Sequence, residues 1–140
     1  MKKLILILSL LLCGCQRQPQ YYLYVYYAKT CPVCRSFINV VIPELEEKYG
    51  THMTITKLNI DQEESIEAYA KTCSLLEEYE VNDDSGSVPF IVLDGYFAKV
   101  GYDIGEDEEM LQAIDDAIEG RELSSDLENI YYFMEGKTYR

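Results

Sequence analysis

Residues 21–34, YYLYVYYAKTCPVC, decide how the chain folds. The first eight, Tyr21–Ala28, are aromatic or aliphatic and contain no glycine or proline, which is typical of a buried strand. Two cysteines follow at a spacing of three, Cys31 and Cys34. The next residues, through Tyr49, repeat apolar side chains at spacings of three and four, which predicts a helix. The stretch therefore predicts a strand and a helix with a cysteine pair at their junction.

The predicted helix covers Pro32–Tyr49 and contains a second proline, Pro43, which is expected to kink it. Gly50 is expected to end it. His52–Ile60 then alternates side chains as a second strand does. Asp61 is expected to cap a second helix. The apolar stripe of that helix would comprise Ile66, Tyr69, Ala70, Cys73, Leu76 and Tyr79.

The second half of the chain begins with a loop of polar residues and glycine at 82–87. Val88–Leu93 and Tyr96–Val100 are predicted strands, joined by a two-residue hairpin turn at Asp94-Gly95. Gly105–Glu119 is the last predicted helix. Its inward side chains would be Met110, Leu111, Ile114, Ala117 and Ile118.

This order of elements predicts an α/β domain over residues 21–120. The first strand, helix and strand form a βαβ unit, whose two strands must be parallel with a right-handed crossover. The hairpin and the last helix form a ββα unit, so the whole is a mixed four-stranded sheet with helices on both faces. Residues 121–140 are expected to dock on the domain through the apolar segment 130–134.

Composition limits the possible functions. The chain has 140 residues, enough for one domain, and 48% of them are hydrophobic, enough for a packed core. The 12 Lys and Arg against 25 Asp and Glu give a formal net charge of -13. Because such a surface repels phosphate backbones, nucleic-acid binding is disfavoured. A single histidine, His52, limits any mechanism that requires a histidine pair.

The first residues are typical of a targeting segment. Two lysines precede the apolar run Leu4–Leu12, which is too short to cross a bilayer but has the length of a signal peptide's apolar region. The sequence Leu12-Cys13-Gly14-Cys15 that follows resembles the cleavage motif of bacterial lipoproteins. The resemblance implies a signal peptide at 1–14, lipid on Cys15 and a polar tether over 15–20. The protein would then be extracytoplasmic and lipid-anchored to the cell membrane, with ordinary secretion or a periplasmic location as the alternative.

The cysteine pair is the motif that carries chemistry. Cys31 lies at a predicted helix N-terminus, where free N–H groups and the helix dipole favour a thiolate. Lys29 and Arg35 flank the pair and can add positive charge. Cys31 would attack a partner disulfide, and Cys34, one turn into the helix, would resolve the mixed disulfide.

The strand, the Cys31-Pro32-Val33-Cys34 motif and the helix resemble the thioredoxin-fold thiol-disulfide oxidoreductases over about Tyr21–Glu119. The resemblance implies that Val88–Pro89 is a cis peptide bond beside the thiols and pairs with the backbone of a substrate. Within this family the chain resembles extracytoplasmic or membrane-tethered bacterial thioredoxin-like proteins, including those associated with bacteriocin transport. The chain departs from thioredoxin itself at Thr30, where tryptophan is usual, and at Val25, where the family has a buried acid.

Other interpretations of the cysteines are open. Cys31 and Cys34 could form half of a zinc site with Cys73 and His52, although those residues are expected far apart. The pair could also be a structural disulfide without turnover. Cys73 is expected to be a core residue and His52 a surface strand residue.

Two functions follow from the sequence. The first is an oxidoreductase that exchanges disulfides with cysteine-containing exported proteins and with a redox partner protein, without cofactor or metal. The alternative is a non-catalytic thioredoxin-fold accessory protein that binds a client or a transporter.

Overall fold

The computed structural model describes residues 18–77, 87–123, 127–128 and 130–132. Its elements are, in order, β1 (Tyr21–Tyr27), α1 (Pro32–Tyr49), the 3-10 turn η1 (Gly50–His52), β2 (Met53–Asn59), α2 (Glu63–Glu77), β3 (Phe90–Leu93), β4 (Phe97–Val100), α3 (Asp107–Ile118) and β5 (Ile130–Tyr132). The predicted signal peptide, Cys15, Tyr79, most of the predicted 82–87 loop and residues 133–140 of the tail lie outside the described residues.

The strands form one mixed sheet in the order β2-β1-β3-β4-β5. β1 and β2 are parallel, with Tyr21 opposite Met53 and Tyr27 opposite Asn59. All other neighbouring pairs are antiparallel. The predicted α/β class and mixed sheet are present, but the sheet has five strands rather than four. The additional strand, β5, pairs with the outer edge of β4 and covers only three residues of the predicted tail.

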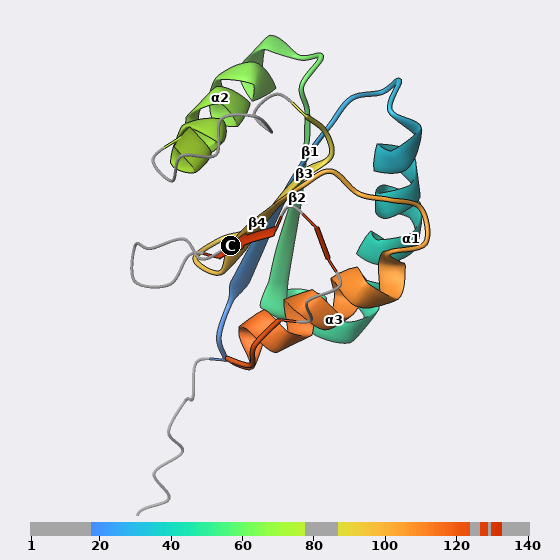
Figure 1. Cartoon of the computed structure of the whole chain (residues 1–140), viewed down its shortest axis with the longest axis vertical. Helices are drawn as coiled ribbons and strands as arrows, with labels where there is room; N and C mark the ends of the chain where they lie inside the picture. Colours follow the sequence, from blue (N-terminus) through green and yellow to red (C-terminus); the bar gives the residue numbers. More distant parts are fainter. Residues whose placement is uncertain (1–17, 78–86, 124–126, 129, 133–140) are drawn as a thin grey trace, which may run out of the picture.

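Helices cover both faces of the sheet, with α1 and α3 on one and α2 on the other (Figure 1). Alternation along β1 sends Leu23 and Val25 to the α1 and α3 face, and Tyr24 and Tyr26 to the α2 face. The sheet is thus apolar on both sides, which explains why β1 lacks the polar alternation of a half-exposed strand.

Helix α1 packs on the sheet through a stripe of side chains that are 0% exposed, including Phe37, Val41 and Leu45. The helix continues through Pro43, whose ring lies on the exposed face. Gly50 follows its last turn with φ of 52°, a conformation that favours glycine. The helix therefore begins and ends as predicted, and its N-terminus lies beside the end of β1.

The predicted apolar stripe of α2 is confirmed for Cys73, which is buried, and for Tyr69, which packs against the same cluster, but it is wrong for Ile66 and Ala70. Ile66 is 51% exposed and Ala70 is also exposed, whereas Ser65, outside the predicted stripe, is buried. The helix is turned so that Ala68 and Thr72 face the sheet, where the Tyr26 hydroxyl lies 3.3 Å from the Ala68 carbonyl and 2.7 Å from Thr72 Oγ1. The buried phenol requires polar partners, so Thr72 and the Ala68 carbonyl supply them within an otherwise apolar cluster.

Two turns also differ from the prediction. Leu93 pairs with Phe97, so the hairpin has a three-residue loop, residues 94–96, instead of a two-residue turn. Gly95 adopts φ of 79° in it. His52 lies in η1, just before β2, and is not a strand residue.

Candidate functional site

A disulfide joins Cys31 and Cys34 at the junction of β1 and α1, with the two Cα atoms 5.3 Å apart. A turn precedes it, closed by the hydrogen bond that the Cys31 N–H donates to the Ala28 carbonyl at 3.1 Å. One turn therefore connects the end of β1 to the cysteine pair. Because β1 packs against helices on both faces of the sheet, it holds this turn in a fixed position.

The two sulfur atoms have different surroundings. Cys31 is the N-cap of α1 and its side chain is partly exposed, whereas Cys34 is 0% exposed. The Cys34 N–H donates to Cys31 Sγ at 3.1 Å. Once the disulfide opens, this N–H and the positive end of the helix dipole would stabilise a Cys31 thiolate. Of the two side chains, only that of Cys31 is accessible from solvent.

Val88 and Pro89 lie beside the pair, although 57 residues separate Val88 from Cys31 in the sequence. The Val88 carbonyl oxygen is 3.9 Å from Cys31 Sγ, and the Val88–Pro89 peptide bond is cis. The Gly101 N–H donates to the Pro89 carbonyl at 2.8 Å. The segment before β3 therefore reaches the partly exposed sulfur of Cys31, and the end of β4 is bonded to that segment.

The two flanking cations are both exposed. Within the described residues, neither Lys29 nor Arg35 forms an ion pair, so their positive charge remains available near the pair. The backbone N–H of Lys29 donates to Asp61 Oδ2 at 3.0 Å. Asp61 was predicted to cap α2, but its carboxylate instead fixes the turn before Cys31. No local sequence signal indicates this contact between the ends of two neighbouring strands.

Tyr102 is a second residue that the sequence did not indicate. Its ring meets that of Phe37 edge to face, with centroids 5.3 Å apart, and its hydroxyl is hydrogen-bonded to Ser36. Burial raises the pKa of Tyr102 and the nearby Asp107 raises it further, while the Ser36 hydrogen bond opposes both. The phenol is therefore neutral at physiological pH and attaches the segment after β4 to the first turns of α1.

Val25 occupies the position where the resemblance implies a buried acid, and it is 0% exposed in the core under α1. A valine cannot carry a proton to or from Cys34.

The zinc alternative is contradicted by the positions of its four residues. His52 precedes β2 at the end where Tyr21 and Met53 pair, and Cys31 follows the opposite end of β1, about 20 Å away for a seven-residue strand. Cys73 belongs to the cluster on the α2 face, across the sheet from α1. Among the described residues, no group of three or more potential metal ligands converges.

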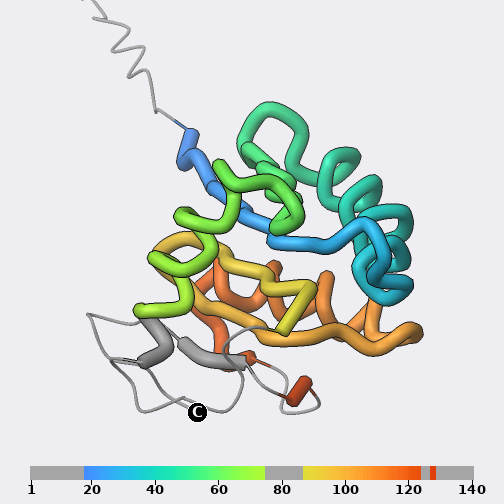
Figure 2. Tube along the Cα trace, turned by 90° about the horizontal axis from the view of Figure 1, so that it is seen from above, coloured from blue at the N-terminus to red at the C-terminus, as the bar shows by residue number. Residues whose placement is uncertain are grey.

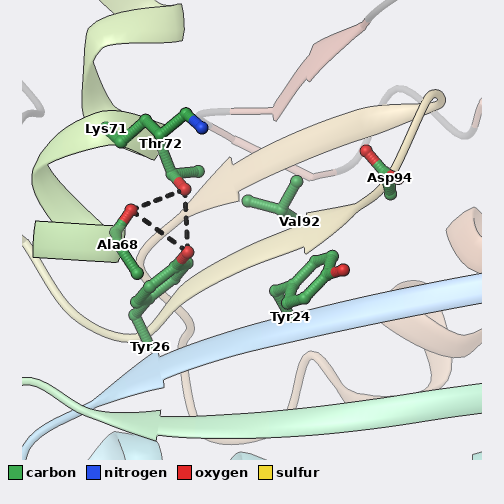
Figure 3. Close-up of a pocket in the computed structure, with 7 residues that line it drawn as sticks. All are labelled: Tyr24, Tyr26, Ala68, Lys71, Thr72, Val92 and Asp94. Carbon is green, nitrogen blue, oxygen red and sulfur yellow. Dashed lines mark hydrogen bonds between the residues drawn. The ribbon is translucent and has the colours of Figure 1, made fainter. Parts of the chain in front are cut away.

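A pocket of about 290 Å³ lies between α2 and the sheet (Figure 3). Tyr24 and Val92 come from the sheet, Thr72 and Lys71 from α2, and Asp94 from the β3–β4 loop. The hydrogen-bonded hydroxyls of Tyr26 and Thr72 form part of its wall. Because it lies on the α2 face, it is separate from the cysteine pair at the start of α1.

Comparison of the chain with protein-family models and with curated proteins finds no match. Across the described residues, none of the helices combines the length and the apolar character needed to span a bilayer.

Proposed function

We propose that the chain is a thioredoxin-like thiol-disulfide oxidoreductase that exchanges disulfides with exported proteins through Cys31 and Cys34. The observation that carries the proposal is the asymmetry of the pair. Cys31 is partly exposed at a helix N-terminus with an N–H directed at its sulfur, and Cys34 is buried one turn later. One nucleophilic sulfur and one shielded sulfur are what a two-step exchange requires.

In the reducing direction, the Cys31 thiolate attacks one sulfur of a client disulfide, and the other client sulfur leaves as a thiolate. Cys34 then loses its proton to solvent and attacks Cys31 Sγ. The second client sulfur leaves, so the client gains two electrons and the Cys31–Cys34 disulfide re-forms. The reverse sequence oxidises a client dithiol with the same atoms.

Val88 supports the binding of an extended client. Its carbonyl lies 3.9 Å from Cys31 Sγ, at the point where a client backbone would reach the sulfur. Pairing between backbones does not depend on side chains, so this contact suits clients of differing sequence.

We also propose that Cys15 carries a lipid after removal of residues 1–14, which places the domain at the outer side of the cell membrane. The clients would then be exported proteins. A redox partner protein at the same surface would return the Cys31–Cys34 pair to its starting oxidation state. Mass spectrometry of the membrane fraction is expected to show a mature chain that begins with acylated Cys15. A mature chain that retains residues 1–12 would contradict this location.

The rival function is a non-catalytic accessory protein that retains the disulfide. The two are distinguished by equilibrating the full chain with glutathione. The oxidoreductase proposal expects the Cys31–Cys34 disulfide to open and re-form reversibly, whereas an accessory protein would keep it closed.

A further inference from the structure

Two positively charged residues are held close to Cys31 by hydrogen bonds of the backbone. The Cys31 N–H donates to the Ala28 carbonyl at 3.1 Å, which closes the turn that contains Lys29. The Arg35 N–H donates to the Cys31 carbonyl at 3.2 Å in the first turn of α1. The Cα atoms of Lys29 and Cys31 are therefore within about 7 Å, and residues one helical turn apart are separated by about 6 Å. Both cations flank the partly exposed cysteine.

The charges of these two residues are available to a partner. Among the described residues, three other cations form ion pairs with carboxylates: Lys48, Lys99 and Arg121. Lys29 and Arg35 are exposed and form no ion pair in that part of the chain. The chain as a whole has 25 acidic residues against 12 basic ones, so the positive charge beside Cys31 is opposite in sign to the net charge.

Two carboxylates of this end of the domain have partners of their own. Asp61 Oδ2 accepts the backbone N–H of Lys29 at 3.0 Å, which leaves the lysine ammonium group free of an ion pair. Glu106 Oε2 accepts the Asp103 N–H at 3.0 Å and lies 3.4 Å from the ammonium group of Lys99. These hydrogen bonds and the ion pair offset part of the negative charge that would otherwise oppose an acidic partner.

The acidic segment before α3 lies on a different side of α1 from Arg35. Ser36 is hydrogen-bonded to Tyr102, and Asp103 and Asp107 follow Tyr102 in the sequence. Successive residues of a helix are turned by about 100°, so the side of α1 that carries Arg35 is not the side that meets this segment. At physiological ionic strength, exposed charges more than about 8 Å apart are largely screened. A client on the Arg35 side therefore experiences mainly the two neighbouring cations.

We infer that the clients of the Cys31–Cys34 pair carry aspartate or glutamate within a few residues of the exchanging cysteine, and that Lys29 and Arg35 bind these carboxylates. The inference rests on the proposed function and names its substrate class. The client thiolate attacks Cys31 Sγ, the Cys31–Cys34 bond breaks, Cys34 leaves as a thiolate that takes up a proton, and the mixed disulfide forms. The two cations change how often an acidic client is held for this attack.

The experiment measures the rate at which peptide thiols open the disulfide of the oxidised full chain. Three synthetic peptides have one cysteine each and differ only at two nearby positions, which are both glutamate, both glutamine or both lysine. The variants are Lys29→Gln and Arg35→Gln, and the matched control is Lys71→Gln, an exposed lysine on α2. Figures 1 and 2 both show α2 on the opposite side of the sheet from the connection between β1 and α1.

The quantity compared is the ratio of the glutamate-peptide rate to the glutamine-peptide rate, each per concentration of peptide thiolate. A general change in the reactivity of Cys31 alters both rates and cancels in this ratio. We expect the glutamate peptide to react fastest with the unsubstituted chain and the lysine peptide slowest. Lys29→Gln and Arg35→Gln should each lower the ratio about three-fold, the scale of one exposed ion pair. Lys71→Gln should leave it unchanged, and about 1 M salt should bring it close to one.

Two results would overturn the inference and leave the proposed function in place. One is a ratio that is the same in Lys29→Gln, Arg35→Gln and Lys71→Gln, and the other is a lysine peptide that reacts faster than the glutamate peptide. A disulfide that resists all three peptide thiols would instead overturn the proposed function.

Discussion

Replacing Cys34 with serine is expected to leave the chain covalently joined to its clients. Cys31 keeps its exposed sulfur, its helix N-terminus and the N–H of residue 34, so it can still attack. The mixed disulfide that forms persists, because the sulfur that would attack it, that of Cys34 one turn into the helix, has been replaced by a hydroxyl. Non-reducing electrophoresis of cells that express Cys34→Ser should show discrete complexes that dithiothreitol releases.

Two other cysteine variants control this result. Cys31→Ser removes the exposed sulfur, so it should trap nothing, even though Cys34 remains. Cys73→Ala combined with Cys34→Ser should trap as well as Cys34→Ser alone, because Cys73 is a free, buried thiol in the cluster on the α2 face. Complexes that persist in Cys31→Ser, or activity that is lost in Cys73→Ala, would contradict the assignment of the two roles.

The second large effect concerns the side chain that supports the site. Phe37 is 0% exposed, belongs to the main core and contacts the Tyr102 ring. Phe37→Ala should lower the free energy of unfolding by about 3–5 kcal/mol, through lost burial and a residual cavity. Urea unfolding followed by circular dichroism measures this change.

Val40→Ala is the matched control, because Val40 lies on the same helix but is 41% exposed. It should change the free energy of unfolding by no more than about 0.5 kcal/mol. Similar losses for both variants would mean that α1 does not pack as described.

The element order was predictable because its evidence is local. The uninterrupted apolar run of β1 and the three-and-four spacing of α1 each specify one element, and the cysteines mark the junction. The stripe of α2 was not predictable in this way. The side of the helix that faces the sheet includes Thr72, which lies there because Tyr26 of β1 brings a hydroxyl to that interface. Hydrophobicity along one helix does not contain that information.

The same limit applies to the site. Cys31 and Cys34 were identified by spacing, and Val88–Pro89 only through the resemblance to a family. Asp61 and Tyr102 contact the turn and the helix at the cysteine pair from distant parts of the sequence. Neither belongs to a motif, so only the tertiary arrangement shows that they position the pair.

The central claim is that the Cys31–Cys34 disulfide exchanges, and an equilibrium redox titration tests it most directly. The full chain is equilibrated in buffers with different ratios of reduced to oxidised glutathione, and the free thiols are then alkylated. Mass spectrometry quantifies the oxidised and reduced forms of the chain. We predict one reversible two-electron transition with a midpoint between roughly -270 and -120 mV, the range of exchange-active thiol proteins, unchanged in Cys73→Ala. A pair that stays oxidised to below roughly -300 mV would be a structural disulfide and would contradict the account.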